Sequence, residues 1–165
     1  MFDPNRYRER CENYLSQVLG CQVVLILAER LVQSTREAPW RLDIRAGGVV
    51  KSYVLQLDAR GIEYEYRVLK AMEAIPLPTP RVYGLDLQGD ALGTPCFFSD
   101  FIVGESLLEA LEAGEAWAET LYMDAVCALQ AVTAGDLGVL AEELTHETAR
   151  DVLEDAYDFL KGQSL

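Results

Sequence analysis

The chain has 165 residues, of which 50% are hydrophobic, and its 27 acidic against 14 basic residues give a formal net charge of −13. This length and composition can bury the core of one compact domain, or of a small lobe with a helical appendage. The negative charge argues against nucleic acid and anionic membranes as partners, because both present phosphate groups. A cationic ligand would suit the chain, although many ordinary cytosolic proteins are equally acidic.

The N-terminus is polar from the start, and no segment approaches the roughly 20 apolar residues that span a bilayer. The four cysteines form no close pair, and the lone His146 has no cysteine nearby. Spacing therefore excludes a zinc finger or a disulfide framework. Acidic neighbours such as those at 142–143 point to different faces of a helix, so we assign no metal site. We expect a soluble, cytoplasmic protein with reduced thiols.

The first part of the chain predicts one helix followed by strands. Apolar residues recur at helical spacing from Tyr7 to Val18, which indicates an amphipathic helix that ends near Gly20. Runs typical of β-strands follow at residues 21–27, 40–44 and 49–57. Three antiparallel strands in sequence order are the simplest arrangement.

The middle of the chain predicts a second helix and two more strands, and the remainder predicts helices. The second helix is expected at residues 62–74 and ends before a proline-rich connector that cannot continue it. Strands follow at 81–87 and 96–103. Helices are then expected at 106–113, 115–132 and 146–161. We therefore predict an α+β fold with about five antiparallel strands, divided into a domain at 1–104 and a helical segment at 105–165.

This order of elements matches the small lobe of the protein-kinase-like fold, and local stretches make the likeness more specific. They lie at residues 30–31 with 40–44, 65–72, 78–82 with 92–95, 97–104 and 129–132. Together they resemble the phosphotransferase family that includes the aminoglycoside phosphotransferases. The resemblance implies a nucleotide-binding N-terminal lobe, with ATP and Mg²⁺ as cofactors, in an enzyme that phosphorylates a small hydroxylated molecule.

The resemblance also places candidate phosphate-binding residues. A loop between the first two strands covers the phosphates in that family, and here it offers Gln33, Ser34 and Thr35 but no glycine. Gln56 stands where the family has a basic residue, and Glu65 where the family has the glutamate that holds it. Glutamine hydrogen bonds but cannot neutralise a phosphate. A plain surface loop and a simply solvated Glu65 are the alternatives.

The strand predicted at 96–103 resembles the family's last small-lobe strand and hinge. The resemblance implies that backbone groups of Ser99, Asp100, Phe101 and Ile102 hold adenine between two lobes. Alternating residues at a strand end are also expected where no base binds, so a purely structural role stays open.

Residues for phosphoryl transfer are not found. The chemistry needs a base-positioning aspartate, a following asparagine and a Mg²⁺-binding aspartate. The nearest string to the family's His-Gly-Asp motif contains Gly135 and Asp136, without the histidine or the asparagine. We interpret it as a turn that ends a helix. His146 is followed by Glu-Thr and also fails the motif. We assign no catalytic residue and expect the chain to be inactive alone.

Two explanations fit the missing large lobe. The chain is a truncated piece of a longer enzyme whose catalytic lobe lies elsewhere, or it is a short protein that keeps the scaffold as a non-catalytic interaction or dimerisation module. Apolar surface left by a missing lobe favours a homodimer. A third hypothesis is a binding protein for some other small molecule, which the sequence does not name.

Overall fold

A computed structural model describes residues 2–31, 39–57, 61–104 and 106–138. In chain order the elements are α1 (Arg8–Leu19), β1 (Val23–Arg30), β2 (Trp40–Ala46), β3 (Val49–Leu57), α2 (Ile62–Met72), β4 (Val82–Asp86), β5 (Cys96–Asp100), α3 (Leu107–Glu112), α4 (Ala116–Gln130) and α5 (Ala134–Leu137).

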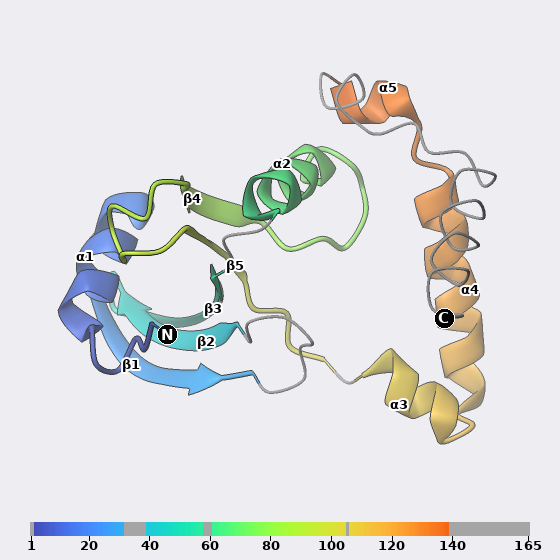
Figure 1. Cartoon of the computed structure of the whole chain (residues 1–165). Coiled ribbons are helices and arrows are strands. Elements are labelled where there is room, and N and C mark those ends of the chain that lie inside the picture. Colours follow the sequence, from blue (N-terminus) through green and yellow to red (C-terminus); the bar gives the residue numbers. More distant parts are fainter. Residues whose placement is uncertain (1, 32–38, 58–60, 105, 139–165) are drawn as a thin grey trace, which may run out of the picture.

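The predicted α+β fold is confirmed. Five antiparallel strands form one sheet in the order β1-β2-β3-β5-β4. The first three strands form two consecutive hairpins. Helix α2 and the connector after it then lead to β4 at the edge of the sheet, and β5 lies between β3 and β4. Helices α1 and α2 flank this sheet (Figure 1). We call residues 2–104 the lobe.

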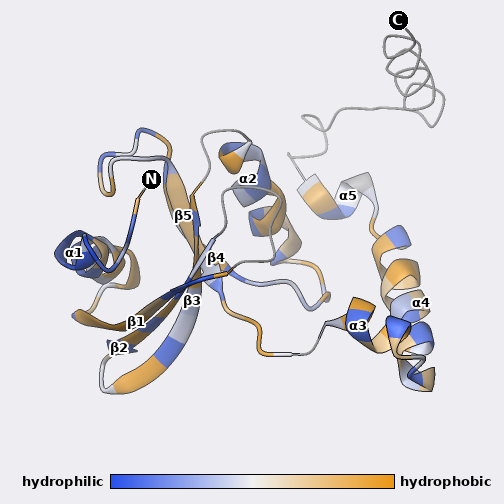
Figure 2. Cartoon of the chain, turned by 60° about the horizontal axis from the view of Figure 1, so that its bottom comes forward, coloured by the Kyte–Doolittle hydropathy of each residue, from blue (hydrophilic) through white to orange (hydrophobic). Residues whose placement is uncertain are grey.

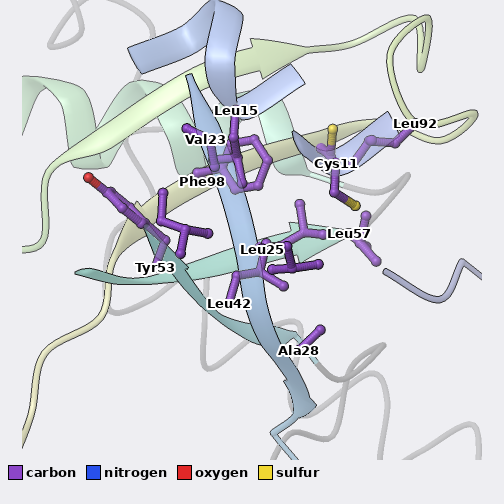
Figure 3. Packing of buried hydrophobic residues seen from close by; sticks show 13 residues of the cluster. Cys11, Leu15, Val23, Leu25, Ala28, Leu42, Tyr53, Leu57, Leu92 and Phe98 are labelled. Atoms are coloured by element: carbon purple, nitrogen blue, oxygen red, sulfur yellow. The ribbon is translucent and has the colours of Figure 1, made fainter. Parts of the chain in front are cut away.

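Two hydrophobic clusters pack on opposite faces of the sheet, as the neighbours Phe97 and Phe98 illustrate. Successive strand side chains point to opposite faces. Phe98 joins the cluster beneath α1, where its ring centroid lies 5.3 Å from that of Tyr14. Phe97 joins the cluster beneath α2, with its centroid 5.6 Å from that of Tyr66. Figure 3 shows the α1 cluster, in which Leu15 points toward the sheet.

Side chains of α1 satisfy backbone groups of β1, which is an edge strand. Glu12 Oε1 accepts a hydrogen bond from the Leu25 N–H at 2.8 Å, and Ser16 Oγ accepts one from the Val23 N–H at 2.9 Å. Arg8 donates from Nη1 to the Leu25 carbonyl. These three residues recur every four positions, so they lie along one helix face. An exposed strand edge is thereby closed to pairing with another chain.

Three predictions of element ends are wrong. The first strand continues to Arg30 instead of ending at residue 27. The last strand stops at Asp100 instead of reaching residue 103, and the Phe101 N–H makes one further bond, to the Ser52 carbonyl at 3.3 Å, in the register of β3 and β5. Gly135 and Asp136 do not end a helix; they lie in the short helix α5. Thr133 and Asp136 form a reciprocal capping box there, which starts a new helical turn. The helix predicted at 146–161 lies outside the described residues.

Helices α3 and α4 form an arm, residues 106–131, that extends away from the sheet (Figure 1). They pack on each other. All arm residues are described, and within the arm only Ala110 and Ala118 are buried. Apolar colouring is visible along α4 in Figure 2. Among the described residues, no helix has the length and apolar character needed to cross a bilayer.

Candidate functional site

The predicted site residues of the lobe are arranged around the α2 side of the sheet. Gln56 in β3 pairs in register with Phe97 of β5, whose ring packs beneath α2. Because register partners share a face, Gln56 also lies on the α2 side. Its neighbours Leu55 and Leu57 belong to the α1 cluster. The structure thus brings Gln56 to the face beside the helix that carries Glu65, and both residues are half-buried.

We call this α2-side surface of β1, β2 and β3 the open face. The residues that register and alternation place on it are Val24, Leu27, Glu29, Arg41, Asp43, Arg45, Val50, Ser52, Val54 and Gln56. Most of them are polar or charged, in contrast to the apolar residues that alternate with them beneath α1. The open face is therefore the solvent-accessible side of the sheet near the predicted hinge.

A polar network fixes the middle of the open face. Arg41 forms two hydrogen bonds to the Asp43 carboxylate, at 3.0 and 3.1 Å, and Ser52 Oγ donates to Asp43 Oδ1 at 2.7 Å. Burial raises the pKa of Asp43, but the hydrogen bonds from Ser52 and Arg41 outweigh it and leave the pKa below its ordinary value. The guanidinium carbon of Arg41 lies 4.7 Å from the ring centroid of Phe101. The network thus ties β2 to the hinge.

The backbone of the predicted hinge is partly engaged within the sheet. Ser99 is buried and pairs with both neighbouring strands. The Asp100 N–H donates to the Arg81 carbonyl at 2.9 Å, and the Phe101 N–H donates to Ser52. Ile102, whose residue surface is 60% exposed, lies beyond the last ladder pair. A base placed here would therefore meet the backbone at Ile102 first.

A pocket of about 520 Å³ lies behind the hinge, toward the α1 side. Its lining residues are Lys51, Ser52, Tyr53, Arg81, Tyr83, Asp100 and Phe101. Tyr83 donates its hydroxyl hydrogen bond to Asp100 Oδ1 at 3.0 Å. Burial, with the hydrogen bond to Asp100, raises the pKa of Tyr83 to about 12, so the phenol stays protonated. The Asp100 side chain is thereby held at the end of β5.

The remaining candidates lie apart from the open face or outside the described residues. Gln33, Ser34 and Thr35 belong to the undescribed segment 32–38. Asp136 borders a pocket of about 450 Å³ between α2 and α5. Its carboxylate accepts the Thr133 hydroxyl at 2.6 Å and the Thr133 N–H at 2.8 Å, so it serves as a capping group.

The described residues offer little support for other chemistries. They contain no group of three or more His, Cys, Asp or Glu side chains arranged to hold a metal ion. Burial raises the pKa of Cys11 and of Cys96 to about 12, so both thiols are protonated at neutral pH and poorly nucleophilic. These two cysteines are core residues beneath α1.

Sequence reasoning missed the network of Arg41, Asp43 and Ser52. A partial signal was present, since Arg41 and Asp43 alternate with apolar residues and must share one face of a strand. The partnership with Ser52 depends on the β2–β3 register, which pairs Asp43 with Ser52. Contact between Arg41 and Phe101 depends on the β3–β5 register, which places Phe101 beside Ser52.

No family model matches the chain, and no curated protein matches it. Among solved structures, the chain resembles one described as a "putative aminoglycoside phosphotransferase" from Ralstonia eutropha JMP134, with a TM-score of 0.50 and 24% identity. The match covers 64% of this chain and 29% of that chain. This chain thus spans under a third of the length of the protein that it matches. The likeness shows a shared fold, and the five-stranded sheet with its helices agrees with a kinase-like small lobe.

Proposed function

We propose that the chain is the nucleotide-binding-type lobe of an aminoglycoside phosphotransferase-like small-molecule kinase, and that it is inactive alone. The observation that carries the proposal is the position of Gln56 on the α2 side of β3, beside the helix that bears Glu65, in a sheet with the kinase-like strand order. Residues 1–104 form the lobe in this proposal. Residues 105–165 begin the large lobe or replace it.

In this proposal ATP lies against the open face with Mg²⁺ on its phosphates. The base contacts Val54 and the backbone at Ile102, and the phosphates extend toward Gln56 and the loop with Ser34 and Thr35. A glutamine amide donates a hydrogen bond to a phosphate oxygen but supplies no positive charge. Nucleotide binding is accordingly weaker than it would be with a lysine at this position.

Catalysis in this proposal depends on residues outside the lobe. Phosphoryl transfer needs an aspartate that positions the nucleophile and further groups that hold Mg²⁺. The sequence has one histidine, His146, and no His-Gly-Asp motif. The capping bonds of Asp136 support a structural role for the nearest candidate. We infer that a catalytic lobe, in another segment or another chain, completes the enzyme.

Isothermal titration with Mg·ATP tests the nucleotide proposal, with the wild type compared with Gln56→Lys. We expect weak binding by the wild type and about tenfold tighter binding by the variant, because lysine adds a charge-assisted contact. Asn13→Lys on exposed α1 adds the same charge away from the open face and should leave the affinity unchanged. An absence of binding by both the wild type and Gln56→Lys would exclude a nucleotide from this face.

The exposed apolar surface of the arm favours a second candidate, a non-catalytic interaction module. Trp117 and Leu121 of α4 are 48% and 51% exposed. Contiguous apolar surface of this kind marks a contact region. If the lobe binds no nucleotide and the arm binds a partner, this second function replaces the first.

A further inference from the structure

The charges of the chain are strongly segregated along the sequence. No lysine or arginine lies between Arg81 and Arg150, while the acidic residues continue throughout that stretch. The arm therefore contains acidic residues without a single basic one. Its acidic residues are Glu109, Glu112, Glu115, Glu119 and Asp124. A partner that covers the arm must accept negative charge.

The arm combines this charge with exposed large apolar side chains. They are Leu108, Trp117, Leu121, Tyr122, Met123 and Leu129, each of which is about half exposed or more. Within the arm, only the two small residues Ala110 and Ala118 are buried. A complementary surface must therefore be apolar as well as basic. A contact between the arms of two copies is disfavoured, because both arms would bring carboxylates into the contact.

The chain carries a surface of this kind at the hairpin end of its open face. Val24, Arg45 and Val50 are register partners across β1, β2 and β3, so their side chains form one row on one face. Val24 is 44% exposed, Val50 is 55% exposed, and Arg45 is exposed between them. Leu27 in the next row adds a further exposed apolar side chain. We call these four residues the β1–β3 patch.

We propose that two copies of this chain associate by placing the arm of each copy on the β1–β3 patch of the other. Apolar side chains of α4 cover Val24, Leu27 and Val50, and carboxylates of the arm surround Arg45. The arm extends away from the sheet of its own chain, as Figure 1 shows. A reciprocal exchange repeats the same contact twice and closes with two-fold symmetry.

This association is independent of the nucleotide proposal. It uses the end of the open face that lies next to the β2–β3 hairpin turn. The nucleotide would contact the other part of this face, at Val54, Gln56 and the hinge. An experiment can therefore find a dimer that binds no nucleotide, or a monomer that binds nucleotide. The two proposals therefore fail separately.

Two native thiols report directly on the proposed contact. Cys21 lies just before β1, Cys127 lies in α4, and both are free and exposed. Copies with Cys21→Ser are mixed with copies that carry Cys127→Ser and treated with a flexible bismaleimide. We expect efficient cross-linking in the mixture and little in either variant alone, because only the mixture offers both thiols in one reciprocal contact. Cross-linking that is equal in all three samples, or lacking in the mixture, overturns the proposal.

Sedimentation velocity over a concentration series measures the association of the full chain. Leu121→Asp on the arm and Val50→Asp on the patch should each weaken dimerisation at least about tenfold. Leu87→Asp, at an exposed site outside both surfaces, is the matched control and should leave it unchanged. Circular dichroism confirms that each variant is folded. A monomer at all concentrations, or a dimer that resists either surface variant, overturns the reciprocal contact.

Discussion

The lobe and the arm use their apolar residues in different ways. In the lobe, α1 and α2 each cover a hydrophobic cluster on one face of the sheet, so that Phe97 and Phe98 are completely buried. In the arm, α3 and α4 pack on each other, but only Ala110 and Ala118 are buried, while Trp117 and Leu121 are about half exposed. Helix propensity is sufficient to specify α4, but its stability depends on burial of an apolar face. The lobe buries its own apolar residues, whereas the arm leaves most of its large apolar side chains exposed.

Core truncation should separate the two regions most strongly. Phe97→Ala removes a buried ring that packs against Tyr66, and it should lower the free energy of unfolding by about 3–5 kcal/mol. Leu121→Ala removes a half-exposed side chain of the arm, and it should change that free energy by no more than about 0.5 kcal/mol in dilute solution. Urea unfolding of both variants measures the difference. Equal losses would mean that the arm belongs to the same core.

A glycine contact should show how tightly α1 is packed on β4. Gly84 has φ +53°, and a Cβ there would clash with Val18 Cγ2. Gly84→Ala should therefore cost about 2–4 kcal/mol, from the left-handed backbone and the clash together. Thermal unfolding of Gly84→Ala with and without Val18→Ala separates the two causes. Val18→Ala should relieve the clash and recover part of the loss, and a failure to recover any of it would place the whole cost in the backbone.

Removal of a hydrogen bond at the edge strand β1 should destabilise the fold less than the two changes above. Glu12→Ala leaves the Leu25 N–H of β1 without its side-chain acceptor, which should cost about 1–3 kcal/mol. Glu9→Ala on the same helix changes the same charge at an exposed position. Chemical denaturation should show a clear loss for the first variant and a change within about 0.5 kcal/mol for the second. Equal effects would attribute the loss to helix charge and not to the edge.

The smallest expected effect is the pH dependence contributed by Asp43. Its native pKa is lowered, so the folded state binds the proton less readily than the unfolded state does. The stabilisation is present above the unfolded pKa of about 4 and is lost as the pH falls through the lower native value. Urea titrations from about pH 6 to about pH 2 should give a shallower acid loss for Asp43→Asn than for the wild type. The same profile for both would argue against the Arg41–Asp43–Ser52 network.

Much of the lobe could be predicted from local patterns. Alternation at residues 40–44 predicted β2, and helical spacing after Gly61 predicted α2. The end of β5 could not be predicted, because it depends on how far the pairing with β3 extends along the sheet. The start of α5 was readable in principle from the spacing of Thr133 and Asp136.

The candidate site could be predicted only in part, because its residues come from separate strands. Alternation places Gln56 on one face, but only the pairing of β3 with β5 shows that this face is the one beneath α2. Pairing also decides that Ser52 reaches Asp43. Nucleotide contacts by Gln56, Glu65 and Ile102 stay predictions that rest on resemblance.

Amide hydrogen exchange of the intact chain in dilute solution tests the central contrast most directly. We predict that amides of β1, β2, β3 and β5 exchange only through global unfolding, while those of α4 exchange through local opening at much lower free energy. Raising the protein concentration should protect α4 as the arm finds its partner. If α4 in dilute solution is protected as strongly as β3, the arm is already part of the lobe's core and the contrast between the two regions does not exist.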